Sequence, residues 1–227
     1  ARTYNLGFTD GRRFAVVATD AGLLDEPVEV DRVLVAPSER AELVVEMSPG
    51  ERVTVRSYPT RIGGGNLPRR FAGGDDTFDL VRLVAADELE TSPPLPDRLP
   101  APAAADAPVD AEPRVFEFNH ASRINGRAFD MERIDERVRL GDTEIWEVSG
   151  EMMAHPLHVH GVHFQVISRA GRAPDVRDQG LRDTVLVKEP VELLVQFTQP
   201  AVKSPFMYHC HILEHEDNGM MGQYVTT

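Results

Sequence analysis

Short apolar runs recur along the first ninety residues and are separated by polar turn signals. The runs cover residues 14–18, 28–35, 41–46, 52–56 and 78–84. Ser48, Pro49 and Gly50 form a turn signal between two of them. Runs of this length and spacing, rich in Val, Leu and Phe, are typical of a β-sandwich or barrel. This pattern predicts an all-β first domain over residues 1–91.

A proline- and alanine-rich stretch, residues 92–113, follows these strands. Proline has no backbone N–H to donate to a sheet ladder, so such a stretch favours extended, semi-rigid chain. We interpret it as a linker between domains. A second domain is then expected over residues 114–227, because strand-like runs resume at 115–118, 137–140, 144–148, 164–167, 184–187 and 191–197.

Length and charge narrow the class of protein further. The 227 residues suffice for one large or two ordinary domains, and no apolar run is long enough to cross a bilayer. The net charge of −13 argues against a nucleic-acid partner. A single cysteine excludes a disulfide within the chain.

The stretch 207–221 holds three histidines, the only cysteine and Met220. Alternate side chains of a strand face opposite sides, so Cys210 should point one way and His209 and His211 the other. His215 follows Cys210 by five residues, and Met220 follows His215 by five. A loop of that length can fold back to bring sulfur, imidazole and thioether around one ion, as in a blue-copper site.

A second dense stretch, residues 155–163, supplies the remaining imidazoles. His158 and His160 share strand parity and should face one side together, whereas His155 precedes a proline that resets the backbone. We therefore expect two metal sites. The ligands predicted for a mononuclear copper site are His155, Cys210, His215 and Met220, and those for half of a polynuclear site are His158, His160, His209 and His211.

These residues form the motifs HPxHxHG and HCHxxxHxxxxM, and through them the chain resembles the multicopper oxidase family of laccases, bilirubin oxidases and bacterial cuprous oxidases. The resemblance implies cupredoxin-like Greek-key β-sandwiches, an incomplete second domain and a complete third. It also implies that the mononuclear site binds type 1 copper. Type 2 copper would bind His158, and the type 3 pair would bind His160, His209 and His211.

The resemblance implies a reaction as well. Single electrons from a phenolic, aromatic or cuprous substrate would enter at type 1 copper, and a trinuclear cluster would reduce dioxygen to water. Glu216 would feed protons toward the cluster, as the matching position does in the family, and Glu151 would hold the imidazole of His155 or meet substrate. The alternative for either residue is a solvated surface glutamate. The setting implied is periplasmic or secreted, with the targeting segment upstream.

The ligand supply is incomplete, because family members take four further histidines from two HxH motifs in their first domain. This chain has no histidine before His120. We therefore expect that Ala1 is not the native start, and that an N-terminal multicopper oxidase domain bearing two HxH motifs completes the molecule as a separate or cleaved chain.

Four other interpretations compete. A blue-copper electron carrier would use type 1 copper alone and leave four histidines without a purpose. A structural zinc site usually has more than one thiolate. A two-domain oxidase with its cluster between subunits lacks ligands in the first half of this chain. A metal-free structural relative would not need intact ligand motifs.

Overall fold

The computed structural model describes residues 2–60, 74–103, 105–108, 112–119 and 122–227. Within these ranges nearly all regular structure is β-strand, with one 3-10 turn, η1 (Val176–Asp178), and one short helix, α2 (Leu213–Asp217). The predicted all-β class is confirmed. No helix in this part of the chain is long and apolar enough to span a membrane.

The first half contains two sheets that face each other across a small apolar core. One has the order β4-β1-β6-β7 and the other β3-β2-β5. Phe8, Phe14, Val16, Leu24 and Val53 are buried between them. The strands are β1 (Tyr4–Phe8), β2 (Phe14–Thr19), β3 (Gly22–Val30), β4 (Val33–Val35), β5 (Glu42–Val44), β6 (Arg52–Ser57) and β7 (Phe78–Val84).

The sequence pattern was wrong about residues 28–35, which do not form one strand. β3 ends at Val30 and β4 begins at Val33, and the two strands belong to different sheets. The polar residues Asp31 and Arg32 lie at the bend between them. β1 was not predicted, although Tyr4, Leu6 and Phe8 alternate with Asn5 and Gly7, because five residues with a glycine among them make a short and weak strand signal.

The second half is a sandwich of two five-stranded sheets, β10-β17-β16-β12-β14 and β13-β15-β11-β8-β9. The predicted runs form strands here with slightly different ends, and β9 and β17 are additional strands. The strands are β8 (Arg114–Asn119), β9 (Arg123–Ile124), β10 (Glu136–Val138), β11 (Thr143–Gly150), β12 (His155–Val159), β13 (His163–Arg169), β14 (Thr184–Val187), β15 (Val191–Gln196), β16 (Phe206–Cys210) and β17 (Met221–Thr226).

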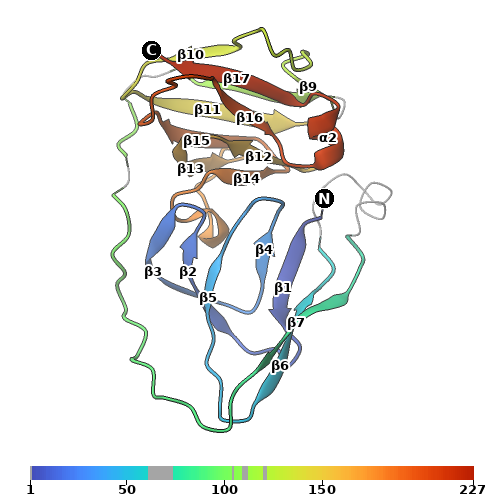
Figure 1. Ribbon diagram of the computed structural model, residues 1–227, viewed down its shortest axis with the longest axis vertical. Helices are drawn as coiled ribbons and strands as arrows, with labels where there is room; N and C mark the ends of the chain where they lie inside the picture. The colour runs from blue at the N-terminus through green and yellow to red at the C-terminus, as the bar shows by residue number, and fades with distance from the viewer. Residues whose placement is uncertain (1, 61–73, 104, 109–111, 120–121) are drawn as a thin grey trace.

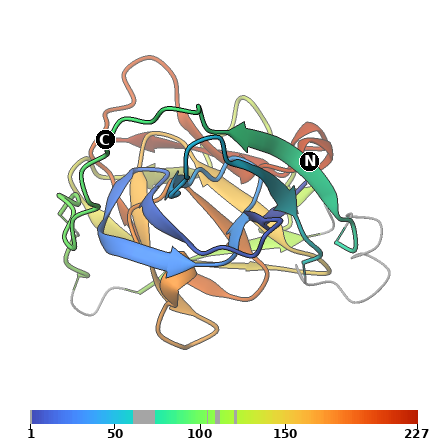
Figure 2. The ribbon, with the colours of Figure 1, turned by 90° about the horizontal axis from the view of Figure 1, so that it is seen from below.

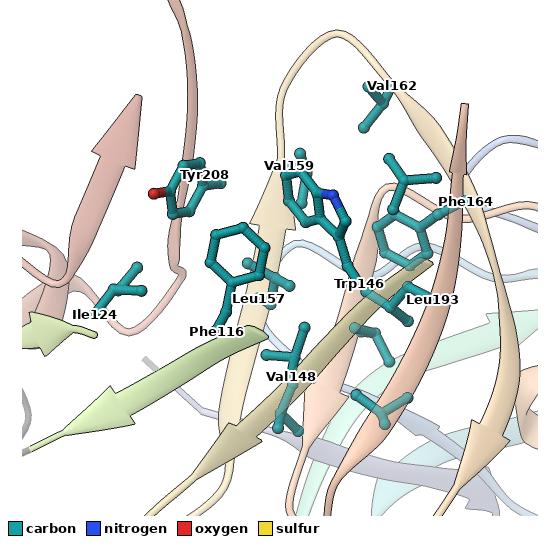
Figure 3. Close-up of a cluster of buried hydrophobic side chains, with 14 of the residues drawn as sticks. Phe116, Ile124, Trp146, Val148, Leu157, Val159, Val162, Phe164, Leu193 and Tyr208 are labelled. Carbon is teal, nitrogen blue, oxygen red and sulfur yellow. The ribbon is translucent and has the colours of Figure 1, made fainter. Parts of the chain in front are cut away.

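Aliphatic and aromatic side chains together fill the core of this second sandwich (Figure 3). The ring of Trp146, on β11, lies 4.4 Å from that of Phe116 and 5.9 Å from that of Tyr208. Tyr208 and Cys210 are two residues apart on β16, so both face this core, while His209 lies on the opposite face of the sheet. The core thus fixes the directions in which the side chains of the triplet His209-Cys210-His211 point.

The two halves lie one above the other, and the segment between them runs along the outside of the molecule (Figure 1). Seen from below, that segment passes along one edge of the first half (Figure 2). The backbone N–H of Leu99 donates to the carbonyl of Asp25, which ties the segment to β3. Where the halves meet, Ala36 packs against Ala154 and Leu186.

Candidate metal centre

Three buried side chains, Cys210, His155 and His215, form the first candidate site. The Cys210 sulfur lies 3.6 Å from Nδ1 of His155 and 3.6 Å from Nδ1 of His215. β12 and β16 are paired antiparallel with Leu157 opposite Cys210, which brings His155 beside the sulfur. One thiol and two imidazoles therefore converge in the interior of the second sandwich.

The turn after β16 places His215 and Met220 around Cys210. In this turn the backbone N–H of His215 donates to the carbonyl of Ile212, that of Met220 to the carbonyl of His215, and that of Cys210 to the carbonyl of Met220. Met220 is fully buried in the same apolar cluster as Cys210. The chain folds back over the predicted interval, but as the short helix α2 and a turn at Gly219 rather than as a plain loop.

The chemistry of these groups fits a soft metal cation. Burial lowers the pKa of His155 to about 4, so its imidazole is neutral at pH 7. Nε2 of His155 lies 3.3 Å from the Glu151 carbonyl and donates to it, which leaves the Nδ1 lone pair facing the sulfur. Nitrogen and sulfur bound to one ion at tetrahedral angles would lie about 3.5 Å apart. The distances of 3.6 Å match this spacing.

Burial raises the pKa of the Cys210 thiol to about 12, because the apolar core disfavours a lone thiolate. A bound cation reverses that preference, since metal ligation requires the thiolate form. The cysteine is thus inert as a nucleophile at neutral pH and suited to a ligand role.

A second group, on the opposite face of the same strands, consists of histidines. His158, His160 and His209 bring one ring nitrogen each within 4.8 Å of the others. The Nε2 atoms of His160 and His209 are 3.1 Å apart. Burial, and then the neighbouring imidazoles, lower the pKa of His160 to about 4. The ring of His211 lies 5.4 Å from that of His209, so the four predicted histidines are neighbours.

The two glutamates singled out from the sequence lie in different surroundings. The carboxylate of Glu216 is 3.4 Å from Nδ1 of His209, although its neighbour His215 points toward Cys210. Successive residues of a helix point about 100° apart, and α2 thereby serves both groups. Glu151 has an exposed side chain, and its backbone carbonyl rather than its carboxylate contacts His155.

Two further histidines lie outside these groups. His163 is exposed, and with His158 and His160 it lines an open cavity of about 430 Å³. His120 lies outside the described residues.

Sequence reasoning missed the residues that hold His158. Its Nδ1 lies 3.0 Å from the carbonyl oxygen of Asp183 and 2.9 Å from the hydroxyl of Thr184. Burial raises the pKa of the Asp183 carboxyl, but hydrogen bonds from His158 and Arg40 outweigh burial and hold it below its usual range. Their sequence signal was weak, a polar pair at the start of the apolar run 184–187.

Known multicopper oxidases are similar to this chain in sequence and in fold. Residues 99–227 match the family model of the multicopper oxidases. The chain is similar to a laccase-like multicopper oxidase, CueO, from Ochrobactrum sp., with 37% identity and a TM-score of 0.86 over 100% of this chain and 53% of that one. A multicopper oxidase from Pediococcus acidilactici matches with 34% identity and a TM-score of 0.82, over 100% and 46%.

Curated relatives carry a different name. The cell division protein FtsP of Pectobacterium atrosepticum is 35% identical over 99% of this chain and 48% of its own length. The FtsP of Yersinia pestis is 34% identical over 100% and 48%. The chain spans about half the length of these relatives.

The chain belongs to the multicopper oxidase family, and its fold is cupredoxin-like. Both follow from the family match, which covers more than half of the chain, together with the structural likeness over all of it.

Proposed function

We propose that this chain is the C-terminal, copper-binding part of a laccase-like oxidase, which takes single electrons from a phenolic, aromatic or cuprous substrate and reduces dioxygen to water. The observation that carries the proposal is the convergence of two imidazoles on the buried sulfur of Cys210. The covalent neighbour His209 lies in a second histidine group on the other face of the strand. One tripeptide thereby joins both sites.

In this proposal His155, Cys210 and His215 would hold type 1 copper, together with the thioether of Met220 as a weaker ligand. His158 holds type 2 copper, and the type 3 pair binds His160, His209 and His211. Four further histidines come from an N-terminal domain of the kind that the longer relatives have room for. When bound, copper supplies one-electron transfer at the cysteine site and dioxygen reduction at the histidine site.

The protein's own groups then have distinct tasks. The apolar core around Cys210 excludes water from the sulfur. The carboxylate of Glu216, 3.4 Å from Nδ1 of His209, passes protons toward the histidine group. The exposed side chain of Glu151, four residues before His155, meets a cationic or phenolic substrate. The domain boundaries at 91 and 114 and the periplasmic or secreted setting stay predictions.

A second function is favoured by the names of the curated relatives. Those at 32–36% identity are called cell division protein FtsP. A role in cell division could be carried by a protein-binding surface on the two sandwiches, without redox chemistry, and we call this alternative the scaffold. The two proposals differ in one property, since the oxidase requires Cys210 as a copper ligand and the scaffold does not.

Copper loading of the wild type and of Cys210→Ser separates these functions. The oxidase predicts an intense blue colour in the wild type, lost in the variant, while copper at the histidine group remains. It also predicts oxygen consumption with a phenol or cuprous ion by the complete protein, abolished by the substitution. A wild type that stays colourless with copper would overturn the oxidase and favour the scaffold. Colour without oxygen consumption by the complete protein would favour an electron carrier.

A further inference from the structure

His158 is held on one side by acceptors alone. Nδ1 faces the carbonyl oxygen of Asp183 at 3.0 Å and the hydroxyl oxygen of Thr184 at 2.9 Å. The Thr184 hydroxyl donates its own hydrogen to the Asp183 carboxylate at 2.9 Å, so toward His158 it can only accept. Nδ1 must therefore carry the proton, and the lone pair is on Nε2.

The first half of the chain fixes this arrangement although it contributes no histidine. Arg40 donates to both carboxylate oxygens of Asp183, at 2.6 and 2.7 Å. The fully buried carboxylate of Asp20 accepts from the backbone N–H of Thr184 at 3.2 Å and from that of Arg40 at 2.7 Å. Arg40 also donates to the carbonyl of Asp20 at 2.8 Å. Both residues come from turns that begin or end strands of the first half.

We propose that Arg40 and Asp20 are positioning residues for the histidine group, because they hold Asp183 and Thr184 where these keep His158 in its Nδ1–H tautomer with Nε2 free to bind a metal. The proposal rests on the proposed function, which makes His158 a copper ligand. It gives the first half a role in the metal chemistry. Residues that orient a ligating histidine typically change metal affinity 10- to 100-fold when they are replaced.

The Arg40→Gln variant should change the tautomer of His158. Without the guanidinium, the Asp183 carboxylate is free to turn away from Thr184. The Thr184 hydroxyl can then donate to Nδ1 of His158 in competition with the Asp183 carbonyl, which still accepts from Nδ1, so that the proton lies on Nε2 in part of the molecules. The tautomer that cannot ligate through Nε2 becomes populated.

Two readouts test this, and the first needs no metal. Long-range ¹H–¹⁵N correlation spectra of the metal-free chain, recorded near pH 8 where free histidine is neutral, report the tautomer of His158. We expect Nδ1–H in the wild type and a mixture in Arg40→Gln. The second readout is a copper(II) titration, in which the histidine group of the variant should bind at least about tenfold more weakly. The blue colour of the cysteine site should not change.

Matched variants separate positioning from general damage. Arg56→Gln removes a 2.6 Å ion pair with Asp79 elsewhere in the first half, and it should leave both readouts at wild-type values. Arg40→Lys keeps the charge without the two-pronged contact and should restore them in part. Adding Thr184→Val to Arg40→Gln removes the hydroxyl that drives the switch, and it should return His158 to Nδ1–H.

The outcomes distinguish this inference from the proposed function. If the histidine group binds copper and Arg40→Gln alters neither tautomer nor affinity, the positioning role is overturned and the oxidase proposal stands. If the wild type binds no copper there but the tautomer switches, the proposed function fails and the positioning contact stands. Should Arg40→Gln not fold, the Arg40→Lys variant carries the same comparison, and wild-type tautomer and affinity in it would count against the inference.

Discussion

Cys210 and His209 are chain neighbours, yet the structure places them in two different chemical environments. The sulfur faces an apolar core that raises its pKa, whereas the imidazole of His209 faces three other histidines and Glu216. The alternation of β16 is sufficient to explain this separation. A substitution on one face of the strand should therefore change one site and leave the other intact.

Met220 offers the first test at this scale. In a cysteine–histidine copper site the potential depends on the weak axial ligand, and an apolar side chain there leaves a higher potential than methionine. Met220→Leu conserves volume and should cost less than about 1.5 kcal/mol in unfolding free energy. We expect the blue colour to persist and the reduction potential to rise in a redox titration followed by absorption.

The neighbouring Met221→Leu variant is the control, since Met221 is only half-buried and begins β17. It should leave the potential unchanged. An unaltered potential in Met220→Leu would show that the thioether is not an axial ligand.

Gly150 offers a second test, because its hydrogen leaves room for a ligand ring. A Cβ built at this position would lie 2.8 Å from Cδ2 of His155, and the backbone there is not in the left-handed region. Gly150→Ala should therefore push the His155 ring away from the sulfur rather than strain the backbone. We expect a shifted or weakened blue absorption after copper loading.

Gly7→Ala is a suitable comparison for Gly150→Ala. The added Cβ would approach the side chain of Arg32 and the backbone oxygen of Asp31 in the first half, away from His155. It should lower stability without changing the absorption. Equal absorption in wild type and Gly150→Ala would mean that the ring can relax in place.

At the scale of elements, strand parity predicted the main feature of the site. The two-residue period of a strand was enough to predict that His209 and Cys210 face opposite sides of β16 and that His158 and His160 face the same side. Helix α2 could not be predicted in this way, since five residues are too few to show helical periodicity. The contacts of His158 with Asp183 and Thr184 depend on strand pairing between β12 and β14, which a single sequence does not reveal.

Arg114 joins three strands of the second sandwich. It donates to both carboxylate oxygens of Glu144 at 2.8 Å and to Glu136 at 2.5 Å, and Trp146 donates its indole N–H to Glu144 at 3.0 Å. Burial alone raises the pKa of Glu144, but the hydrogen bonds from Arg114 and Trp146 outweigh it and leave the pKa below its ordinary value of 4.5. The ionised carboxylate therefore stabilises the fold.

Glu144→Gln should lower the free energy of unfolding by about 1–3 kcal/mol at pH 7, because an amide cannot accept from both arms of the guanidinium. A group with a depressed folded pKa stabilises above its unfolded pKa and loses that contribution as the pH falls through the folded value. The difference between wild type and variant in urea unfolding should therefore shrink below about pH 4. A difference between wild type and Glu144→Gln that stays constant with pH would contradict the account.

At the scale of the whole molecule, the two halves are joined by polar contacts beside a small apolar patch. Thr19 and Ala21 donate to the carbonyl of Leu181, and Arg40 pairs with Asp183. These contacts place the first half directly behind the histidine group. Weakening the contacts between the halves should therefore change the position of His158 before it changes that of Cys210.

Glu39, at the boundary between the halves, makes the contact between them depend on pH. Its carboxylate accepts from the backbone N–H of Ala36 at 2.7 Å, and the nearest Arg182 nitrogen is 3.7 Å away. The buried Nε of Arg182 has no hydrogen-bond partner in the described part of the chain. Burial raises the pKa of Glu39, and the attraction of Arg182 only partly opposes it.

The raised pKa of Glu39 makes the protein less stable at higher pH. Since the folded protein holds the Glu39 proton more tightly than the unfolded chain, stability falls as the pH rises from the ordinary value of 4.5 through the folded pKa. This carboxyl contributes a slope of at most about 1.4 kcal/mol per pH unit. Glu39→Gln should remove that contribution, so that the variant gains stability relative to wild type between pH 4 and pH 8 in urea unfolding. If the stability of Glu39→Gln instead ran parallel to that of the wild type across this pH range, Arg182 would fully compensate the buried charge.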